Sequence, residues 1–511
     1  MVMIKQLDEK MKSIPKEYIV TFICTMVFGS LAHYYAFTNK ITNHDDIRTT
    51  CAEMNEVRWG RWLLAYASDL SGNISMPFNC LLGLIFIAFS AAFVVAILNI
   101  KSTILSGIVG GIMGTFPTIT FNNLYAATAD CYPLAILFMV VATYIAVRSR
   151  KLWVSIIGPA ILMTLSQGIY QAYMGIALGL MIIVGIVELI YEKSDFKTVL
   201  LKEIRFLGTS VLGIIMYLLT SKIICRILGV EMDSYQNMDN MGSIDLAELP
   251  LQIRHSYTKT LGYYLWNVRG VHYKWLSVTL VIVAVATLAF LVTVVIKNRV
   301  EKLELALVIV LMMLLPMASG YIYITGADHI HLLVIYSFIC IPLLTIVVMD
   351  KLSSEKSICV NLFEGFGIFV FAAVVYNYIT LANTVYMIDY YTYEESYSWA
   401  QTVSTVIRTT PGYDIDSKIY MIGLPKSKAI AVDEFYDDDP RTAEFDGTGL
   451  RRDFNAEYSK NGFYWYFLGL TNTIKDIDMD DAEEMGVGDI EIFPSENSVI
   501  EIDGDIIIRF E

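Results

Sequence analysis

Residues 275–296 read WLSVTLVIVAVATLAFLVTVVI, a run of 22 residues without one charged side chain. At a rise of 1.5 Å per residue, a helix of this length crosses the hydrocarbon core of a bilayer, which is about 30 Å thick. The composition of the whole chain agrees, because 55% of its 511 residues are hydrophobic, 17% are charged and the mean hydropathy is +0.54. These values exclude an ordinary soluble globular protein and identify the lipid bilayer as a partner.

Similar apolar runs recur from residue 18 to residue 383, so the sequence predicts a polytopic α-helical membrane protein with about eleven transmembrane helices. Eight further runs are clear and two are weaker. The clear runs are 18–37, 78–98, 133–147, 172–190, 206–224, 303–319, 332–349 and 358–383, and the weaker ones are 103–117 and 152–167. No small-residue cleavage pattern follows the first run, so we expect a retained helix. The seven scattered cysteines imply no disulfide framework.

Lysine and arginine residues are concentrated in alternate connections between the predicted helices. They lie in the amino-terminal segment, at residue 101, and in residues 148–151, 193–205, 297–302 and 351–356. Because cationic loops resist translocation, we expect these connections and the amino terminus to be cytoplasmic. The connections 38–76, 118–132, 226–274 and 321–331, and everything after residue 383, are then extracytoplasmic.

The chain changes character after residue 383. Residues 384–511 contain 27 acidic and 10 basic side chains, so this part alone makes the protein acidic. Residues 418–423 and 499–510 have the pattern of strands, with Gly504 at a hairpin position, and residues 464–470 are rich in aromatic side chains. The sequence therefore predicts a transmembrane domain over 1–383 and a small extracytoplasmic α+β domain over 384–511.

The first extracytoplasmic connection contains the polar stretch Asn43-His44-Asp45-Asp46. Residues 47–67 then combine two tryptophans with a helical repeat, which predicts a helix in the membrane interface that holds the acidic pair at a fixed depth. The repeat consists of Val57, Arg61, Leu64 and Ser68. Asp45 and Asp46 are equally well explained as a helix cap and an acid in the first helical turn, and the two explanations are compatible.

Two more polar clusters border predicted helices. Asp130-Cys-Tyr132-Pro precedes one span, where Asp130 either serves chemistry or caps the next helix. Residues 166–173 read SQGIYQAY and place amide and phenol groups where a sugar can be hydrogen-bonded, although a polar turn in an aromatic belt explains them as well. The candidate sugar-binding residues here are Gln167, Tyr170, Gln171 and Tyr173.

The order of these clusters resembles that of the bacterial Gtr-type glucosyl transferases, the glucosyl transferase II family, which are similar to the C-type polytopic glycosyltransferases. His44-Asp45 resembles the family's His-Asp element, and Gly60-Arg61-Trp62 resembles its Gly-Arg-aromatic element. Asp130-Cys-Tyr132 resembles its Asp-x-Tyr element, and Tyr170-Gln171-Ala-Tyr173 resembles its Tyr-Gln-x-Tyr element. Later parts of the chain resemble the family only in layout. Where members often carry an arginine in a later outside connection, this chain has Asp328-His329-Ile-His331.

The resemblance implies a GT-C-like fold and transfer of a hexose, most often glucose, from a polyprenyl-phosphate carrier such as undecaprenyl phosphate. The acceptor is then a cell-surface glycan at the outer face of the bacterial inner membrane. Inverting transfer needs a carboxylate that takes the proton of the acceptor hydroxyl, and a guanidinium fork matches the leaving phosphate. We assign Asp45 as the base, Asp130 as a second acid that orients acceptor or sugar, and Arg61 as a phosphate or structural partner. His44 and Tyr132 belong to the same motifs.

The remaining candidates have weaker functional interpretations. Asp46 is the less favoured acid, and Arg58 is explained as well by snorkelling toward water as by phosphate binding. His329 and His331 could face one ligand, but a metal site needs a third ligand that the sequence does not identify. Basic residues of the long connection 226–274, Arg269 among them, either attract anionic headgroups or are solvated.

Other functions have less support in the sequence. A membrane transporter or a lipid-linked sugar flippase would place ionisable residues near the membrane midplane and show an internal repeat, and the chain has neither pattern. A surface glycan polymerase shares the location and differs in its donor. No nucleotide-binding glycine pattern occurs, and the acidic run from Asp476 fails the calcium-loop pattern at its sixth and twelfth positions. We therefore expect no cofactor and no nucleic-acid partner.

Overall fold

The computed structural model describes residues 13–41, 43, 45–47, 56–72, 77–232, 247–325, 330–353, 355, 357–423, 439–445 and 457–511. They form two compact units. The helical unit comprises Met1–Phe37, Asn55–Asn123 and Thr128–Asn383, and the sheet unit comprises Thr38–Met54, Leu124–Ala127 and Thr384–Glu511. The sheet unit thus contains two short segments, from the predicted extracytoplasmic connections 38–76 and 118–132, in addition to the acidic tail.

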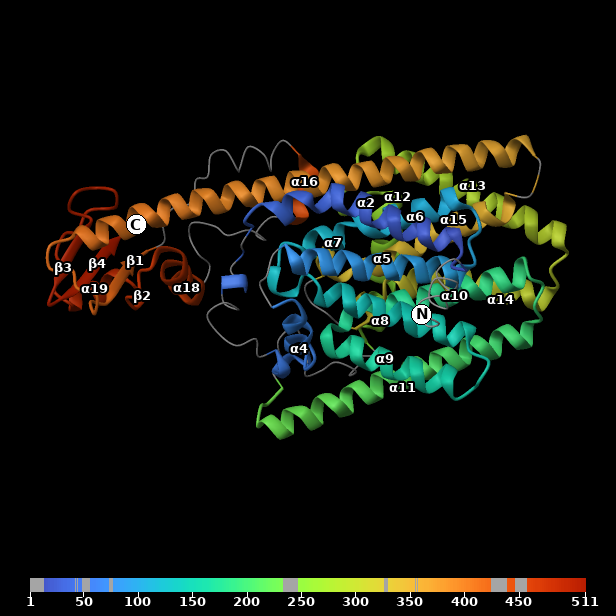
Figure 1. Cartoon of the computed structure of the whole chain (residues 1–511), viewed down its shortest axis with the longest axis horizontal. Coiled ribbons are helices and arrows are strands. Elements are labelled where there is room, and N and C mark those ends of the chain that lie inside the picture. Colours follow the sequence, from blue (N-terminus) through green and yellow to red (C-terminus); the bar gives the residue numbers. More distant parts are fainter. Residues whose placement is uncertain are drawn as a thin grey trace, which may run out of the picture. The chain divides into compact units, whose positions relative to one another are not determined.

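The helical unit is a bundle of long apolar helices (Figure 1). Its helices are α2 (Lys16–Thr38), α4 (Leu64–Ser68), α5 (Phe78–Leu98), α6 (Thr103–Thr115), α7 (Pro117–Asn122), α8 (Cys131–Arg148), α9 (Val154–Ile169), α10 (Met174–Ile190), α11 (Phe196–Leu228), α12 (Leu249–Leu265), α13 (Lys274–Asn298), α14 (Lys302–Ser319), α15 (Cys340–Leu352) and the first part of α16 (Ile358–Thr409). Short 3₁₀ turns join them: η1 (Val57–Trp59), η2 (Asp69–Ser71), η3 (Ala126–Thr128), η4 (Gln171–Tyr173), η6 (Tyr321–Ile324), η7 (Leu332–Val334) and η8 (Tyr336–Ile339).

Nine helices of the described chain are long and apolar enough to cross a membrane, which makes the protein a multi-pass membrane protein. The predicted spans 152–167 and 332–349 correspond to α9 and α15, which have 16 and 13 residues, fewer than the ~20 needed to cross unaided. The count of eleven is therefore not confirmed. In the second case, Pro342 restricts the helix, because proline fits only the first turn, and 3₁₀ turns replace the amino-terminal part of the predicted span.

Two elements differ from the expected layout. Helix α11 begins at Phe196, ten residues before the apolar run, because the Asp195 carboxylate caps it by accepting a hydrogen bond from the Thr198 amide (2.9 Å). Most of the predicted basic loop 193–205 is therefore helical. Helix α12 lies in the predicted connection 226–274 and packs against the end of α14, where Gly320 leaves room for Thr260.

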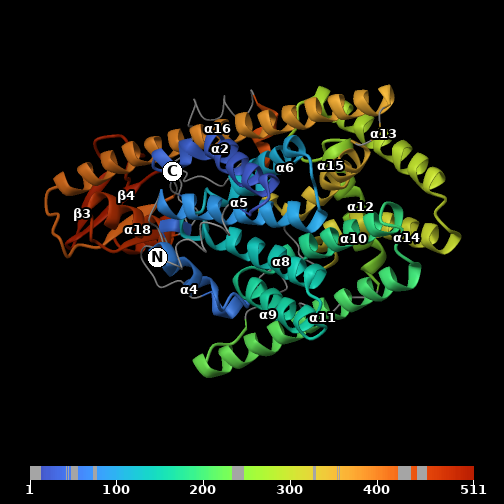
Figure 2. The same ribbon diagram turned by 45° about the vertical axis from the view of Figure 1, so that its right-hand side comes forward.

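Helices α5, α8, α9 and α11 lie side by side in that order in both views (Figures 1 and 2), and α10 packs against α14. Small residues permit the closest approaches. A Cβ at Gly83 of α5 would overlap the carbonyl oxygen of Ala129, so only glycine lets α5 pass directly beside the turn that leads into α8. This contact positions the backbone that carries Asp130.

The sheet unit contains four strands in the order β2-β1-β4-β3: β1 (Ile419–Ile422), β2 (Ile474–Ile477), β3 (Val499–Ile502) and β4 (Asp505–Arg509). Strand β1 pairs in parallel with β2 and β4, whereas β3 and β4 form an antiparallel hairpin. The hairpin predicted at Gly504 is present, with positive φ at Asp503 (51°) and Gly504 (88°), as a two-residue turn of this type requires. Helices α18 (Glu457–Leu468) and α19 (Met479–Glu484), turn η9 (Pro440–Phe445) and the end of α16 complete the unit.

Alternation along the strands gives this sheet two apolar faces. Ile419, Met421 and Ile508 face one core with α16 and α18, while Ile422 and Ile507 face a smaller core with α19. Ile47, which follows the first helix in the chain, is buried in the larger core. The segment that contains Asp45 and Asp46 is therefore anchored in the sheet unit.

Candidate active site

Asn43 and Asp46 build the turn that contains Asp45. The Asn43 side-chain oxygen accepts hydrogen bonds from the amides of Asp45 (2.9 Å) and Asp46 (3.1 Å), and the Asp46 carboxylate accepts one from the Asn43 amide (3.4 Å). This reciprocal pattern is a capping box, in which the side chain of each residue accepts a hydrogen bond from the backbone amide of the other. These amides have no backbone partner in the first turn of a helix. The capping function considered for the acidic pair is thus performed by Asn43 and Asp46.

Asp46 also ties this turn to the second connection. Its other carboxylate oxygen accepts a hydrogen bond from the Ala127 amide (3.2 Å), and the Asn43 side-chain amide donates to the carbonyl oxygen of Leu124 (2.8 Å). Burial raises the pKa of Asp46 to about 7, although the backbone amides around it favour the charged form. Its predicted contact with substrate stays a prediction, beside this clear structural function.

Asp45 is half-buried at the second position of the turn, next to the anchored Asp46. A carboxylate there is held by a rigid backbone while part of it remains accessible to solvent, which suits a proton acceptor. His44 lies outside the described residues.

Gly60-Arg61-Trp62 forms a sharp turn that interrupts the interfacial helix predicted over 47–67. Turn η1 ends at Gly60, whose φ of +74° is a left-handed conformation, and α4 begins only at Leu64. A Cβ at position 60 would also overlap the Tyr217 hydroxyl. The helical repeat was misleading here because one glycine, forced into this conformation by its neighbours, interrupts it. Residues 48–55 lie outside the described chain.

This turn packs directly against the 166–173 cluster. The amide of Leu63 donates to the Gly168 carbonyl oxygen (2.8 Å), and the Trp62 ring lies where a Cβ of residue 168 would be. The Gln171 side-chain amide donates to the Trp59 carbonyl oxygen (3.0 Å) and to the Tyr217 hydroxyl (2.9 Å). Two motifs that are more than 100 residues apart in the sequence therefore form one structure.

Arg61 lies over an aromatic stack at this junction. Its guanidinium carbon is 5.0 Å from the centre of the Tyr170 ring, and its Nη1 is 3.4 Å from a Glu56 carboxylate oxygen. The Tyr132 and Tyr170 rings are stacked with centroids 4.2 Å apart, and the Tyr173 hydroxyl donates to the Leu333 carbonyl oxygen (3.2 Å). The Tyr170 ring face and the Glu56 carboxylate thus fix the orientation of the planar guanidinium group and of its N–H donors.

Asp130 occupies the cap position of α8, but its side chain makes no capping hydrogen bond. The residue is 1% exposed, and one carboxylate oxygen accepts a weak hydrogen bond from the Cys131 thiol (3.4 Å). The Ser71 hydroxyl lies beside the carboxylate, yet the second oxygen has no hydrogen-bond partner of normal geometry within the described part of the chain. Since buried polar atoms are nearly always paired, this oxygen is a candidate for a substrate contact.

Gln167 and His331 contact protein groups outside the junction of Arg61 with Tyr170. The Gln167 side chain is buried and donates back to the Met163 carbonyl oxygen (3.2 Å), so its environment is that of a helix interior. His331 is stacked on Phe121, with ring centroids 5.0 Å apart. His329 lies outside the described residues, and the described side chains contain no group of three or more His, Cys, Asp or Glu residues that could hold a metal. Arg58 is exposed on η1.

Comparison of the sequence with known protein families identifies one that matches this chain. The family model "Glucosyl transferase GtrII" matches residues 34–349, which is more than half of the chain and includes all four motifs. The chain belongs to the GtrII glucosyl transferase family. No curated protein and no solved structure matches it. Membership confirms the resemblance drawn from the motifs and identifies this GtrII protein as a glycosyltransferase.

Three residues of the candidate site carry functions that the sequence pattern does not predict directly. Asn43 is the cap of the turn, and an asparagine three residues before an acid is the local signal for it. Glu56 precedes Arg61 by five residues, a spacing that predicts no contact on a helix. Tyr217 lies in a predicted span, and no sequence signal links it to Gln171.

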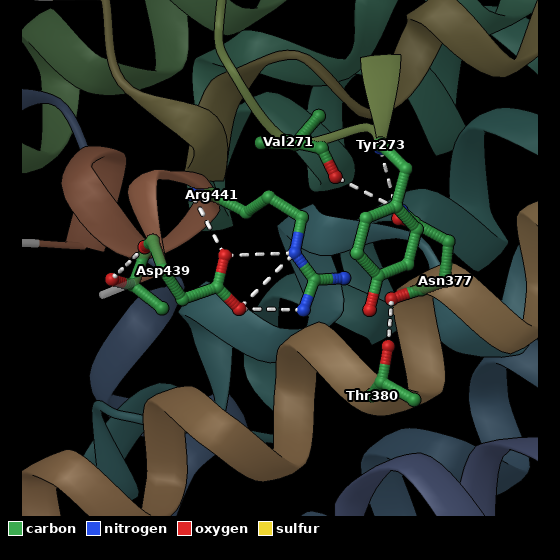
Figure 3. A network of polar contacts seen from close by, with 7 residues as sticks. Val271, Tyr273, Asn377, Thr380, Asp439 and Arg441 are labelled. Atoms are coloured by element: carbon green, nitrogen blue, oxygen red, sulfur yellow. Dashed lines mark hydrogen bonds and ion pairs between the residues drawn. The ribbon is translucent and has the colours of Figure 1, made fainter. Parts of the chain in front are cut away.

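Two polar contacts outside the candidate site hold local structure in the GtrII protein. In the helical unit, the Asn377 side chain of α16 donates to the Val271 carbonyl oxygen (2.9 Å) and accepts from the Tyr273 amide (3.3 Å), which fixes the loop before α13 (Figure 3). In the sheet unit, the carboxylate of Asp439 binds the guanidinium of Arg441 (Figure 3). Burial alone would raise the pKa of Asp439, but the bonds from Arg441 outweigh it and lower that pKa.

Proposed function

We propose that this GtrII protein transfers a hexose, most simply glucose, from a polyprenyl-phosphate carrier to a cell-surface glycan at the outer face of the bacterial inner membrane. The observation that carries the proposal is Arg61, oriented over the Tyr132–Tyr170 stack by Glu56. Tyrosine hydroxyl groups can hydrogen-bond sugar hydroxyls, and a planar guanidinium matches two phosphate oxygens. A sugar phosphate contains both of these groups.

The proposed reaction is a single inverting displacement. The acceptor hydroxyl oxygen attacks the anomeric carbon from the face opposite the phosphate, and Asp45 takes the hydroxyl proton as the new bond forms. The bond between the anomeric carbon and the phosphate oxygen breaks, and its electron pair leaves with the phosphate. Because the departing phosphate is a stable anion, it needs no general acid, and Arg61 stabilises the charge that develops on it.

Asp130 is the proposed second acid. Its buried, unpaired carboxylate oxygen can accept a hydrogen bond from a hydroxyl of the sugar or of the acceptor. A negative charge near the reacting ring also stabilises the positive charge that builds on the anomeric carbon in the transition state. This proposal gives Asp45 and Asp130 different functions, proton transfer for the first and orientation for the second.

The proposed orientation follows the positive-inside rule. The basic connections lie on the cytoplasmic side, and the first two polar connections and the sheet unit then lie outside, where a glycan acceptor is accessible. Asp45, Asp46 and Ile47 belong to the same compact unit as the acidic tail, which supports a common location for them.

A transfer assay tests the function. Purified protein is given radiolabelled undecaprenyl-phosphate glucose and a mixture of surface glycans, and we expect label in a new glycosidic bond of inverted anomeric configuration. Label that crosses the bilayer of a proteoliposome without a new bond would instead identify a flippase, and dependence on an oligosaccharide donor would identify a polymerase.

The Asp45→Asn variant tests the assignment of the base. It retains size and polarity, so we expect normal expression with a rate lower by about 10²–10⁴-fold. Asp416→Asn, in the same sheet unit and exposed, is the matched control and should leave the rate unchanged. Full activity of Asp45→Asn would reject Asp45 as the base.

A further inference from the structure

The helical unit contains an apolar cavity of about 300 Å³ between α12, α13, α14 and α15. Its wall includes Leu265 of α12, Ala284 and Leu288 of α13, Pro316 of α14 and Leu344 of α15. A volume of this size lies at the lower end of the range for small-molecule sites, roughly 300–1,000 Å³. None of the candidate catalytic residues lines it.

The wall leaves hydrocarbon as the suitable occupant. Two of its three hydroxyl groups donate hydrogen bonds to carbonyl oxygens, Tyr264 to Phe338 (3.1 Å) and Thr287 to Val283 (2.8 Å). The third, Thr345, is paired with Thr287, with 3.2 Å between the hydroxyl oxygens. A polar ligand would lose its hydrogen bonds to water without gaining hydrogen bonds in the cavity, which disfavours its binding. A hydrocarbon chain has no such hydrogen bonds to lose.

The cavity can be reached from the bilayer. Along α13 it extends from Leu280 to Leu288, which is about 12 Å at 1.5 Å per residue. Leu288 lines the cavity and is also 51% exposed on the outside of the helical unit. Because α13 is long and apolar enough to cross a membrane, that exposed side faces lipid, and the occupant enters from there.

A fixed positive charge lies close to the wall of the cavity. Phe338, which accepts the hydrogen bond of Tyr264, is stacked with Tyr323 (6.5 Å between centroids). The Arg269 guanidinium donates to the Tyr323 hydroxyl (3.0 Å) and to the Ile330 carbonyl oxygen (2.6 Å). An anionic headgroup attached to a chain in the cavity therefore has a cation a few side chains away.

The same segment continues to the candidate active site. Two residues beyond His331, the carbonyl oxygen of Leu333 accepts the Tyr173 hydroxyl, and the Tyr173 ring lies 5.5 Å from Tyr170. Tyr170 in turn carries Arg61 on its face. An unbroken series of contacts thus leads from the hydrocarbon cavity, past Arg269, to the proposed sugar and phosphate site.

We propose that this cavity binds the isoprenoid chain of the lipid-linked donor, with the phosphate end of the chain toward Arg269. The inference rests on the proposed function and adds the place where the carrier is recognised. The chain is already dissolved in lipid, so binding gains packing contacts and orientation instead of a hydrophobic driving force. We therefore expect the cavity to act mainly on the KM of the donor.

Chain-length selectivity in a filled cavity tests the proposal. The variant Ala284→Trp fills the cavity, and its neighbour Val285, 61% exposed to lipid, supplies the control Val285→Trp. Each protein is assayed with undecaprenyl-phosphate glucose and with a short analogue in which a methyl group replaces the isoprenoid chain. We expect wild type and Val285→Trp to prefer the long donor by at least tenfold in kcat/KM, and Ala284→Trp to lose this preference through a higher KM while it retains activity on the short donor.

The outcomes separate the two proposals. If wild type transfers glucose from neither donor, the proposed function fails. If wild type transfers glucose but Ala284→Trp keeps the wild-type preference, the cavity does not hold the donor chain. Native mass spectrometry would then identify a phospholipid as the occupant if wild type copurifies with one and Ala284→Trp does not.

A photoreactive donor gives a second test in case Ala284→Trp does not fold. A long-chain donor with a diazirine in its second isoprene unit is expected to label residues 280–288 of the wild type. Labelling confined to helices that do not line the cavity would overturn the inference.

Discussion

The Asp46 carboxyl group should make the turn around Asp45 sensitive to pH. Its pKa is about 7 in the folded protein against a reference of 3.8, because burial disfavours the charged form. The folded state therefore holds the proton more tightly than the unfolded state, so the stabilisation is complete below pH ~4 and is lost as the pH rises through 7. Three pKa units at about 1.36 kcal/mol each give an upper bound of about 4 kcal/mol between pH 4 and pH 8.

Hydrogen exchange at the Ala127 amide, which donates to Asp46, measures this change directly. After correction for intrinsic exchange rates, wild-type protection at Ala127 should be greater at pH 5 than at pH 8. In Asp46→Asn the difference should disappear, because the amide oxygen can still accept from Ala127 but does not titrate. Asp45→Asn should keep the wild-type trend. Equal protection at both pH values in the wild type, or the same trend in Asp46→Asn, would refute the reasoning.

Three further substitutions test the site. Asp130→Asn should fold normally and lower kcat by about 10²-fold or more, measured by glucose transfer, because the unpaired oxygen loses its charge. Arg61→Lys should raise the KM of the donor by about tenfold through loss of the planar fork, whereas the exposed Arg58→Lys should not change it. Gly60→Ala should lower both the melting temperature and activity, because a Cβ there overlaps Tyr217, while Gly229→Ala, with a similar φ of +65° and open space around it, should cost only about 1 kcal/mol.

Hydropathy located the long spans because burial in lipid requires an uninterrupted apolar run, and residues 78–98 agree with α5 in both bounds. The hydropathy pattern did not predict the helical segments that contain charged or polar residues. The first ten residues of α11 carry several charges and are held by the Asp195 cap, and α12 is amphipathic and packs against α14. Strand β2 was missed for the same reason, since two of its four residues are Lys475 and Asp476, which are exposed.

The motifs were recognisable in the sequence, but their contacts were not. Tyr170 and Gln171 were selected for their hydrogen-bonding groups, and the structure brings both to the Gly60–Trp62 turn. Nothing in the local sequence indicates that Gly60 approaches Tyr217, because the approach depends on the packing of α11 beside α9. Of the two explanations that the sequence leaves open for Asp130, its position before α8 agrees with a cap, but no local pattern shows that its side chain makes no capping bond.

The packing of Ile47 imposes an order on biosynthesis. Ile47 shares a core with Ile506, Ile508 and Phe510, which the ribosome adds roughly 450 residues later. At about 5–20 residues per second, that delay is about 20–90 s. The turn around Asp45 leaves the ribosome long before β4, yet it obtains its permanent neighbours only when β4 emerges. A nascent polypeptide halted before that point lacks the hydrophobic anchor for its proposed base, so synthesis of β4 and maturation of this turn are coupled.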